Sequence, residues 1–152
     1  MIFADKARKI IEEECEDYFF GIVDLSNAQN PDIEQYSSLF NEYPRAISIG
    51  ITQPLIVTEG LVDDDVGYDI IDWQLKIITS HLINLLEKED YNAFSVPKSQ
   101  NVKDKNFTSL NIIVAHQADM GVIESNGLLI TPEVGSAVKW GTVLTDAPID
   151  LG

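Results

Sequence analysis

The segment from residue 69 to residue 88 constrains the fold of this chain more than any other part of the sequence. Its apolar residues recur at steps of three and four, the spacing of one helical face: Ile71, Leu75, Ile78, Leu82 and Leu85. Asp69 near the start and Lys88 near the end suit the helix dipole. The pattern therefore predicts a long helix packed on the core, with Trp73 and His81 beside the stripe as packing or surface residues.

Helices and strands are interspersed along the rest of the chain, without repeats or a low-complexity linker. Further helices are expected at 4–19, 32–42 and 108–118, and strands at 19–25, 46–52, about 92–96, 128–131 and 137–145. The last two strands are expected to form an antiparallel pair. The acidic triplet 63–65 is interpreted as a solvated loop or a helix start. These elements predict a single α+β domain over 1–152, with a central mixed or antiparallel sheet flanked by helices.

Charge and cysteine content exclude several kinds of function. Ten Lys and Arg against 25 Asp and Glu give a net charge of −15, which opposes binding of nucleic acid by this domain alone. No stretch is apolar enough to span a membrane, so we expect a cytoplasmic protein. Cys15 is the only cysteine, so this chain alone cannot ligate an iron–sulfur cluster or a four-cysteine zinc ion. Cys15 is expected to be a small buried hydrophobe on the stripe of helix 4–19.

No standard catalytic motif is present, and the catalytic residues stay unknown. The region 118–148 is the most informative, because Gly121 and Gly127 bracket a tight connection between a helix and a strand. Glycines there allow either an ordinary turn or the close approach of a ligand to the backbone. Trp140 and Gly141 in the last strand likewise indicate either a bulge or a place where a flat ligand lies on the sheet.

One continuous run carries a resemblance to a known family. SNGLLITPEVGSAVKWGTVLTDAP at 125–148 resembles the stretch that precedes the ferredoxin-like cysteine motifs of epoxyqueuosine reductase and reductive dehalogenase-like iron–sulfur oxidoreductases. YPRAISIGI at 43–51 and YNAFSVPKSQ at 91–100 are similar more weakly. The resemblance implies a nitroreductase-like N-terminal domain that holds cobalamin, followed by a segment with two [4Fe–4S] clusters. Those clusters would come from chain beyond Gly152 or from a ferredoxin-like partner protein.

The resemblance also implies a cofactor site and shows where this chain departs from the family. The expected cofactor-binding residues are Gly121, Asn126, Gly127, Leu128, Leu129, Trp140, Gly141 and Thr142, with no metal ligand among them. Relatives have A-G-L-G-W-x-G-K where this chain has 118–125, so that Asp119 and Glu124 replace two glycines. The stretch VPKS at 96–99 lacks the family's proposed aspartate proton donor.

Three hypotheses follow from the residues and the resemblance. The chain is a corrinoid-binding domain of an iron–sulfur oxidoreductase, or a degenerate member that acts as a binding or assembly module, or, by fold analogy alone, a flavin-binding domain. The first two rank nearly equal. Homo-oligomerisation is compatible with all three, and the substrate is undefined.

Overall fold

A computed structural model describes residues 3–26, 37–52, 64–96, 110–125 and 128–149. The helices are α1 (Phe3–Glu12), α3 (Ser37–Glu42), α5 (Asp64–Glu87) and α6 (Leu110–Gln117). The strands are β1 (Tyr18–Asp24), β2 (Arg45–Thr52), β3 (Ala93–Ser95), β4 (Val122–Ile123), β5 (Leu129–Ile130) and β6 (Val138–Thr145). No helix in these described ranges is both long and apolar enough to cross a membrane.

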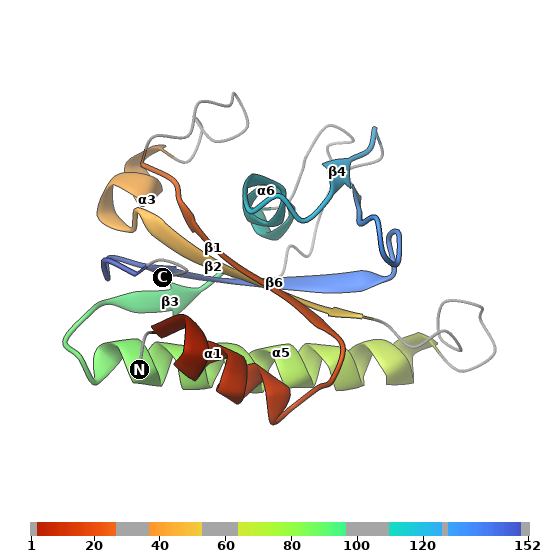
Figure 1. Cartoon of the computed structure of the whole chain (residues 1–152), viewed down its shortest axis with the longest axis horizontal. Helices are drawn as coiled ribbons and strands as arrows, with labels where there is room; N and C mark the ends of the chain where they lie inside the picture. The colour runs from red at the N-terminus through yellow and green to blue at the C-terminus, as the bar shows by residue number, and fades with distance from the viewer. Residues whose placement is uncertain (1–2, 27–36, 53–63, 97–109, 126–127, 150–152) are drawn as a thin grey trace.

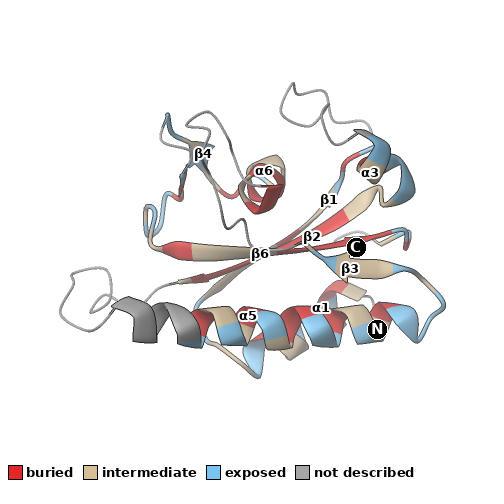
Figure 2. Ribbon diagram, turned by 180° about the vertical axis from the view of Figure 1, so that it is seen from behind, coloured by how far each residue is buried: buried red, intermediate tan, exposed pale blue. Residues whose placement is uncertain are grey.

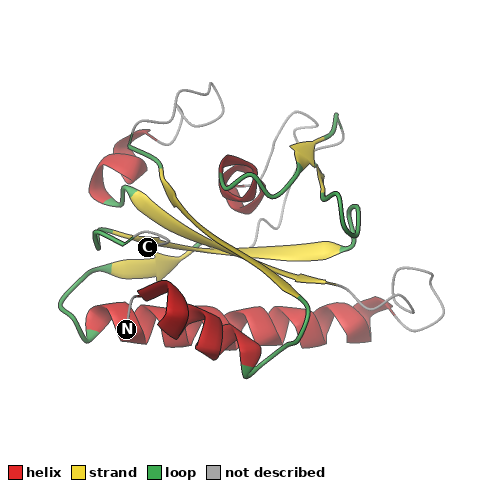
Figure 3. Cartoon of the chain, viewed as in Figure 1, coloured by secondary structure: helices red, strands yellow, loops and turns green. Residues whose placement is uncertain are grey.

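The main sheet has four antiparallel strands in the order β1-β2-β6-β3, and a small second sheet pairs β4 with β5. Helices α1 and α5 cover one face of the main sheet, whereas α3, α6 and the small sheet lie on the other (Figures 1 and 3). This arrangement confirms the predicted α+β fold, with an antiparallel central sheet flanked by helices.

The face of the sheet toward α5 holds the largest core cluster. Every second residue of β2, namely Ile47, Ile49 and Ile51, packs there against the buried stripe of α5, which runs through Ile71, Leu75, Ile78, Leu82 and Leu86. Figure 2 shows this buried stripe along α5 facing the sheet. The sequence prediction was one residue off at its end, since Leu86 is 3 % exposed and Leu85 only half-buried. A four-residue step after Leu82 keeps this side chain over the sheet because the helical repeat is 3.6 residues.

The helix α5 also begins earlier than its apolar pattern indicates. It starts at Asp64 within the acidic triplet, five residues before the expected start. Carboxylates favour the first turn of a helix because unpaired N–H groups gather there, so the triplet fits a helix start. Trp73 and His81 are exposed on the outer side of α5, as the prediction of surface positions allowed.

The expected helix 4–19 ends at Glu12, and β1 begins at Tyr18. The aromatic and β-branched residues that follow pair in a continuous ladder with β2, which overrides the helical spacing of Cys15 and Tyr18. Cys15 lies in the intervening bend, half-buried against the α5 core cluster, with its thiol 3.6 Å from the Ile11 carbonyl. Burial raises the pKa of the Cys15 thiol, and Glu14 and Asp17 raise it further.

The predicted pairing of the last two strands is wrong. Strand β6 lies between β2 and β3 in the main sheet, and β5 pairs instead with β4, in a stretch predicted to be a loop. The physical reason is burial, because 142–145 is buried and a strand covered on both faces belongs in the interior of a sheet. Within the described part of expected helix 32–42, α3 occupies 37–42.

Candidate functional site

The end of α6 has a backbone geometry that usually calls for glycine. Asp119 has φ 62°, and the amide of Met120 donates to the carbonyl of Ala115 at 3.2 Å. This is the left-handed cap that ends many helices, where glycine is favoured because it has no Cβ. Asp119 stands where relatives of the resembled family have a glycine, so a helix cap is sufficient to explain a glycine at that position.

Gly121 is required by close packing of the chain on itself. A Cβ at this position would lie 2.5 Å from the carbonyl oxygen of Ile130 and 2.9 Å from its carbonyl carbon. The carbonyl oxygen of Gly121 is 3.1 Å from Nδ1 of His116, which therefore donates as the protonated nitrogen. The group that packs closely against Gly121 is therefore the backbone of β5, and not a ligand.

The small sheet has one face inside the protein and one face in solvent. Ile123 and Leu129 are opposite each other and pack inward with Ala115 and Met120. On the other face Val122 is 64 % exposed, and Leu128, which comes just before β5, is 48 % exposed. Two large apolar side chains therefore lie on the outer surface of a two-stranded hairpin.

A tight turn follows β5 in the sequence. Thr131 Oγ1 accepts from the amide of Val134 at 3.0 Å and donates to the carbonyl of Gly135 at 3.0 Å. Val134 is 38 % exposed at this turn. We call the described residues 118–125 and 128–135 the hairpin corner. Its exposed acidic residues are Asp119, Glu124 and Glu133, so the corner combines exposed apolar side chains with negative charge.

Residues 140–142 of β6 point alternately to the two faces of the main sheet. The Trp140 ring lies 5.6 Å from the Phe19 ring between centroids, and its Cζ3 atom would be 2.6 Å from a Cβ at Gly50. Gly141 faces α5, where a Cβ would lie 3.2 Å from Leu75 Cδ2. Trp140 and Gly141 therefore cannot line one groove, and β6 runs through this stretch without a bulge.

Three buried polar atoms on the α6 side have no hydrogen-bond partner within the described residues: Ser48 Oγ, Thr142 Oγ1 and Asn111 Oδ1. Ser48 and Thr142 are directly opposite each other on β2 and β6. We call these three residues the polar seam. Sequence reasoning named only Thr142, although a serine inside the apolar strand AISIGIT is a signal that could have indicated the second member.

The expected cofactor residues are only partly brought together. Leu129 is buried in the core, Leu128 is exposed, and Asn126 and Gly127 lie outside the described residues. Gly121 and Gly141 are each occupied by the chain itself, on opposite sides of the sheet. These contacts and the exposed carboxylates of the hairpin corner do not fit a bulky cofactor with a phosphate tail. Cofactor binding by these eight residues is not tested by the structure and stays a prediction. No cluster of three metal-ligating side chains occurs in the part of the chain that the structure describes.

The described elements form an antiparallel four-stranded sheet between a layer of α1 and α5 and a layer that contains α6 (Figure 1). Solved epoxyqueuosine reductases share this fold. A selenomethionine-labelled enzyme aligns with TM-score 0.62 and 17 % identity over 96 % of this chain and 46 % of its own. The Streptococcus thermophilus enzyme gives 0.61 and 17 % over 99 % and 47 %, and the Bacillus subtilis enzyme 0.54 and 17 % over 96 % and 45 %.

The chain thus spans about half the length of the epoxyqueuosine reductases that it matches, and at this identity the likeness shows a shared fold. No family model matches the sequence. No curated protein matches it either.

Proposed function

We propose that this chain is a non-catalytic domain with the epoxyqueuosine reductase fold, and that its hairpin corner binds another polypeptide. The observation that carries the proposal is the contrast between the two sides of the corner. Its inner side is filled, since Gly121 contacts the Ile130 carbonyl and Leu129 is in the core. Val122 and Leu128 are exposed on its outer side, and Val134 is exposed on the turn that follows β5.

Large exposed apolar side chains that gather on one surface are typical of protein-binding sites. Three of the five large hydrophobic residues that are exposed in the described ranges belong to this corner. The exposed carboxylates of Asp119, Glu124 and Glu133 add negative charge to the corner. The charge complementarity of protein interfaces therefore favours a partner with an apolar centre flanked by Lys or Arg.

The corrinoid-binding hypothesis is the second candidate, and the shared fold favours it. An iron–sulfur segment or ferredoxin-like protein would then supply electrons to the cofactor. Two observations oppose it. The space beside Gly121 is filled by the backbone of Ile130, and a phosphate group would be repelled by the carboxylates of Asp119 and Glu124.

A display selection with random peptides on the whole chain tests the proposal. We expect enriched peptides with apolar residues flanked by Lys or Arg, whose affinity falls at least tenfold with Leu128→Asp. The matched control is Trp73→Asp, which adds the same charge at another exposed apolar position, on α5, and should leave binding unchanged. Peptides that bind both variants equally, or a selection without basic flanks, would overturn the proposed site.

A further inference from the structure

Among the described residues, no strand pairs with the outer side of β1, which is an edge of the main sheet. It is the first strand in the order β1-β2-β6-β3, and it pairs with β2 over all seven residues without a bulge. In Figure 1 it crosses in front of β2 and β6, nearest to the viewer. A strand of this length is long enough to pair with another strand along its free side.

The hydrogen bonds beyond each end of the strand show which groups face away from β2. Thr52 donates to the Asp17 carbonyl at 3.4 Å, and the amide of Leu25 donates to the Pro44 carbonyl at 2.7 Å. Because direction alternates along an antiparallel strand, the odd-numbered residues between Asp17 and Leu25 bond to β2. The N–H and C=O groups of the even-numbered residues 18–24 point outward.

These outward backbone groups have no hydrogen-bond partner among the described residues of the chain. The sequence YFFGIVD contains no Lys and no Pro, which natural edge strands use to prevent pairing. Its one charged residue, Asp24, is already engaged by Arg45 at 3.1 Å and by the Ser26 hydroxyl at 2.6 Å.

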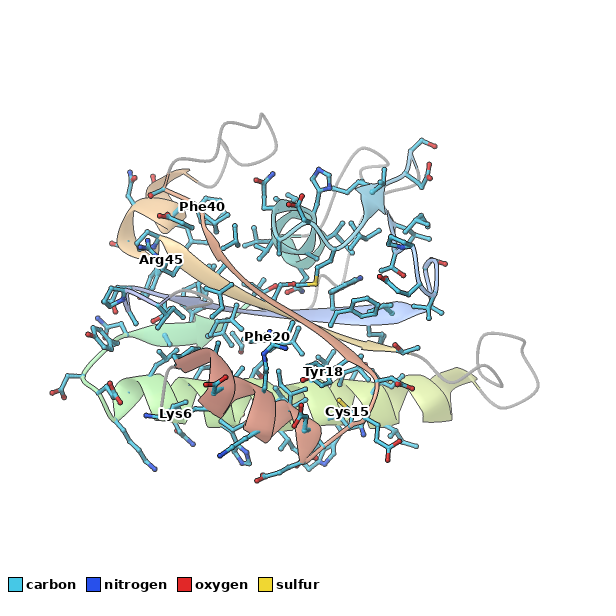
Figure 4. All side chains as sticks on the ribbon, viewed as in Figure 1. Lys6, Cys15, Tyr18, Phe20, Phe40 and Arg45 are labelled. Carbon is cyan, nitrogen blue, oxygen red and sulfur yellow. The ribbon has the colours of Figure 1, made fainter. Side chains whose placement is uncertain are left out.

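Side chains of helix α1 contact Tyr18 and Phe20 of β1. The Arg8 guanidinium lies 5.1 Å from the centre of the Phe20 ring, and the Tyr18 hydroxyl donates to Glu12 at 2.8 Å. Figure 4 shows Tyr18 and Phe20 on β1 beside α1. The edge is therefore held in an extended, ordered conformation, which lowers the entropy cost of adding a strand.

We propose that β1 pairs antiparallel with β1 of a second copy of this chain about a twofold axis. A register centred on Gly21 overlaps all seven residues. It places Tyr18 of one copy opposite Asp24 of the other, and Phe20 opposite Ile22, so that all the outward groups bond in pairs. Gly21 lies on the axis, opposite Gly21 of the second copy.

Self-pairing also accounts for the composition of the edge. Phe20 opposite Ile22 is a favourable cross-strand pair of an aromatic and a β-branched residue. The net charge of −15 makes two copies repel at long range. We therefore expect dimerisation to strengthen as salt screens this repulsion. Strand β1 lies at the opposite edge of the main sheet from β3, and its outward backbone groups are not part of the hairpin corner.

The test is the mass of the whole chain in solution by sedimentation equilibrium, at low and high salt. Wild type should have twice the monomer mass, with a larger dimer fraction at high salt. Ile22→Pro removes an outward N–H without removing a bond to β2 and should give a monomer, whereas Ile22→Ala keeps this N–H and should remain dimeric. Far-UV circular dichroism of both variants reports whether they fold.

Hydrogen exchange of the wild type provides a second readout that needs no variant. In the dimer the amides of Phe20 and Ile22 should be protected at high protein concentration and lose protection on dilution, whereas those of Phe19 and Gly21 stay protected throughout. A monomeric mass at millimolar concentration, or fast exchange of Phe20 and Ile22 at every concentration, would overturn the proposal.

Discussion

The two faces of the main sheet differ in how their buried polar side chains are satisfied. On the α5 face the buried side chains are mostly aliphatic, and the buried hydroxyls of Thr79 and Thr145 both have partners. On the α6 face the polar seam has none among the described residues, and Gly21 and Gly50 leave room only for side chains of the chain itself. The α6 face therefore carries buried polar groups whose desolvation is not offset by a hydrogen bond within the described residues, whereas the buried hydroxyls on the α5 face are hydrogen-bonded.

The largest expected effect is a truncation on the α5 face. Leu86→Ala should lower the free energy of unfolding by about 2 to 5 kcal/mol, because it leaves a cavity in a well-packed core. Leu85→Ala is the matched control and should cost less than half as much, since Leu85 is half-buried. Urea unfolding of both variants measures the difference. Equal losses would show that the two positions share the core.

On the α6 side the sharpest steric test is Gly121→Ala. The new Cβ would meet the backbone of Ile130, which cannot move like a side chain, so we expect a loss of about 1 to 3 kcal/mol. Gly141→Ala is the control, because its Cβ would meet only the flexible end of Leu75 at 3.2 Å. If thermal unfolding shows Gly121→Ala to be harmless, the corner is looser than described and could admit a ligand.

Two threonines on β6 compare the faces directly. Thr145 Oγ1 donates to the Asn92 carbonyl at 2.7 Å and accepts from the Ala147 amide at 3.1 Å. Thr145→Val should therefore destabilise the fold by about 1 to 3 kcal/mol. Thr142→Val removes a buried hydroxyl without a partner in the described chain, and should be neutral or stabilising by up to about 1 kcal/mol. A loss at Thr142 as large as that at Thr145 would mean that its hydroxyl has a partner in solution.

The smallest expected effect concerns the ends of the two helices. Asp90 after α5 and Asp119 after α6 both have positive φ, at 67° and 62°. Asp90→Gly and Asp119→Gly should each stabilise the protein by roughly 0.5 to 1 kcal/mol, because glycine adopts this conformation without strain. Differential scanning calorimetry of the two variants gives the comparison. A lower melting temperature for Asp119→Gly alone would indicate that its carboxylate has a stabilising role at the hairpin corner.

The parts of the fold that the sequence predicts are those set by local periodicity. The stripe from Ile71 to Leu82 and the strand predicted at 46–52 are confirmed. The stripe depends on one amphipathic helical face, whereas β2 is buried on both faces of the sheet. The pairing of β6 was missed because strand partners depend on tertiary burial, which residue spacing does not contain. The end of α1 was missed because the strand ladder of Tyr18 outweighs its helical spacing.

The candidate site was predictable only in outline. Glycine content pointed to Gly121, but the partner of its close contact, the Ile130 carbonyl, is brought there by the β4–β5 pairing. The resemblance to iron–sulfur oxidoreductases led to the fold that the solved epoxyqueuosine reductases share. It could not indicate that Leu129 is buried and Leu128 exposed. This difference favours a docking surface at the hairpin corner over a cofactor groove.

A titration of the whole chain with hydroxocobalamin tests whether the hairpin corner is closed to a corrinoid. A corner filled on its inner side and carrying exposed carboxylates should leave the visible spectrum of the corrinoid unchanged. It should also leave the melting temperature of the protein unchanged at a hundredfold excess of ligand. A saturable spectral shift together with a rise in melting temperature would contradict the account, because a ligand that binds only the folded state must stabilise it.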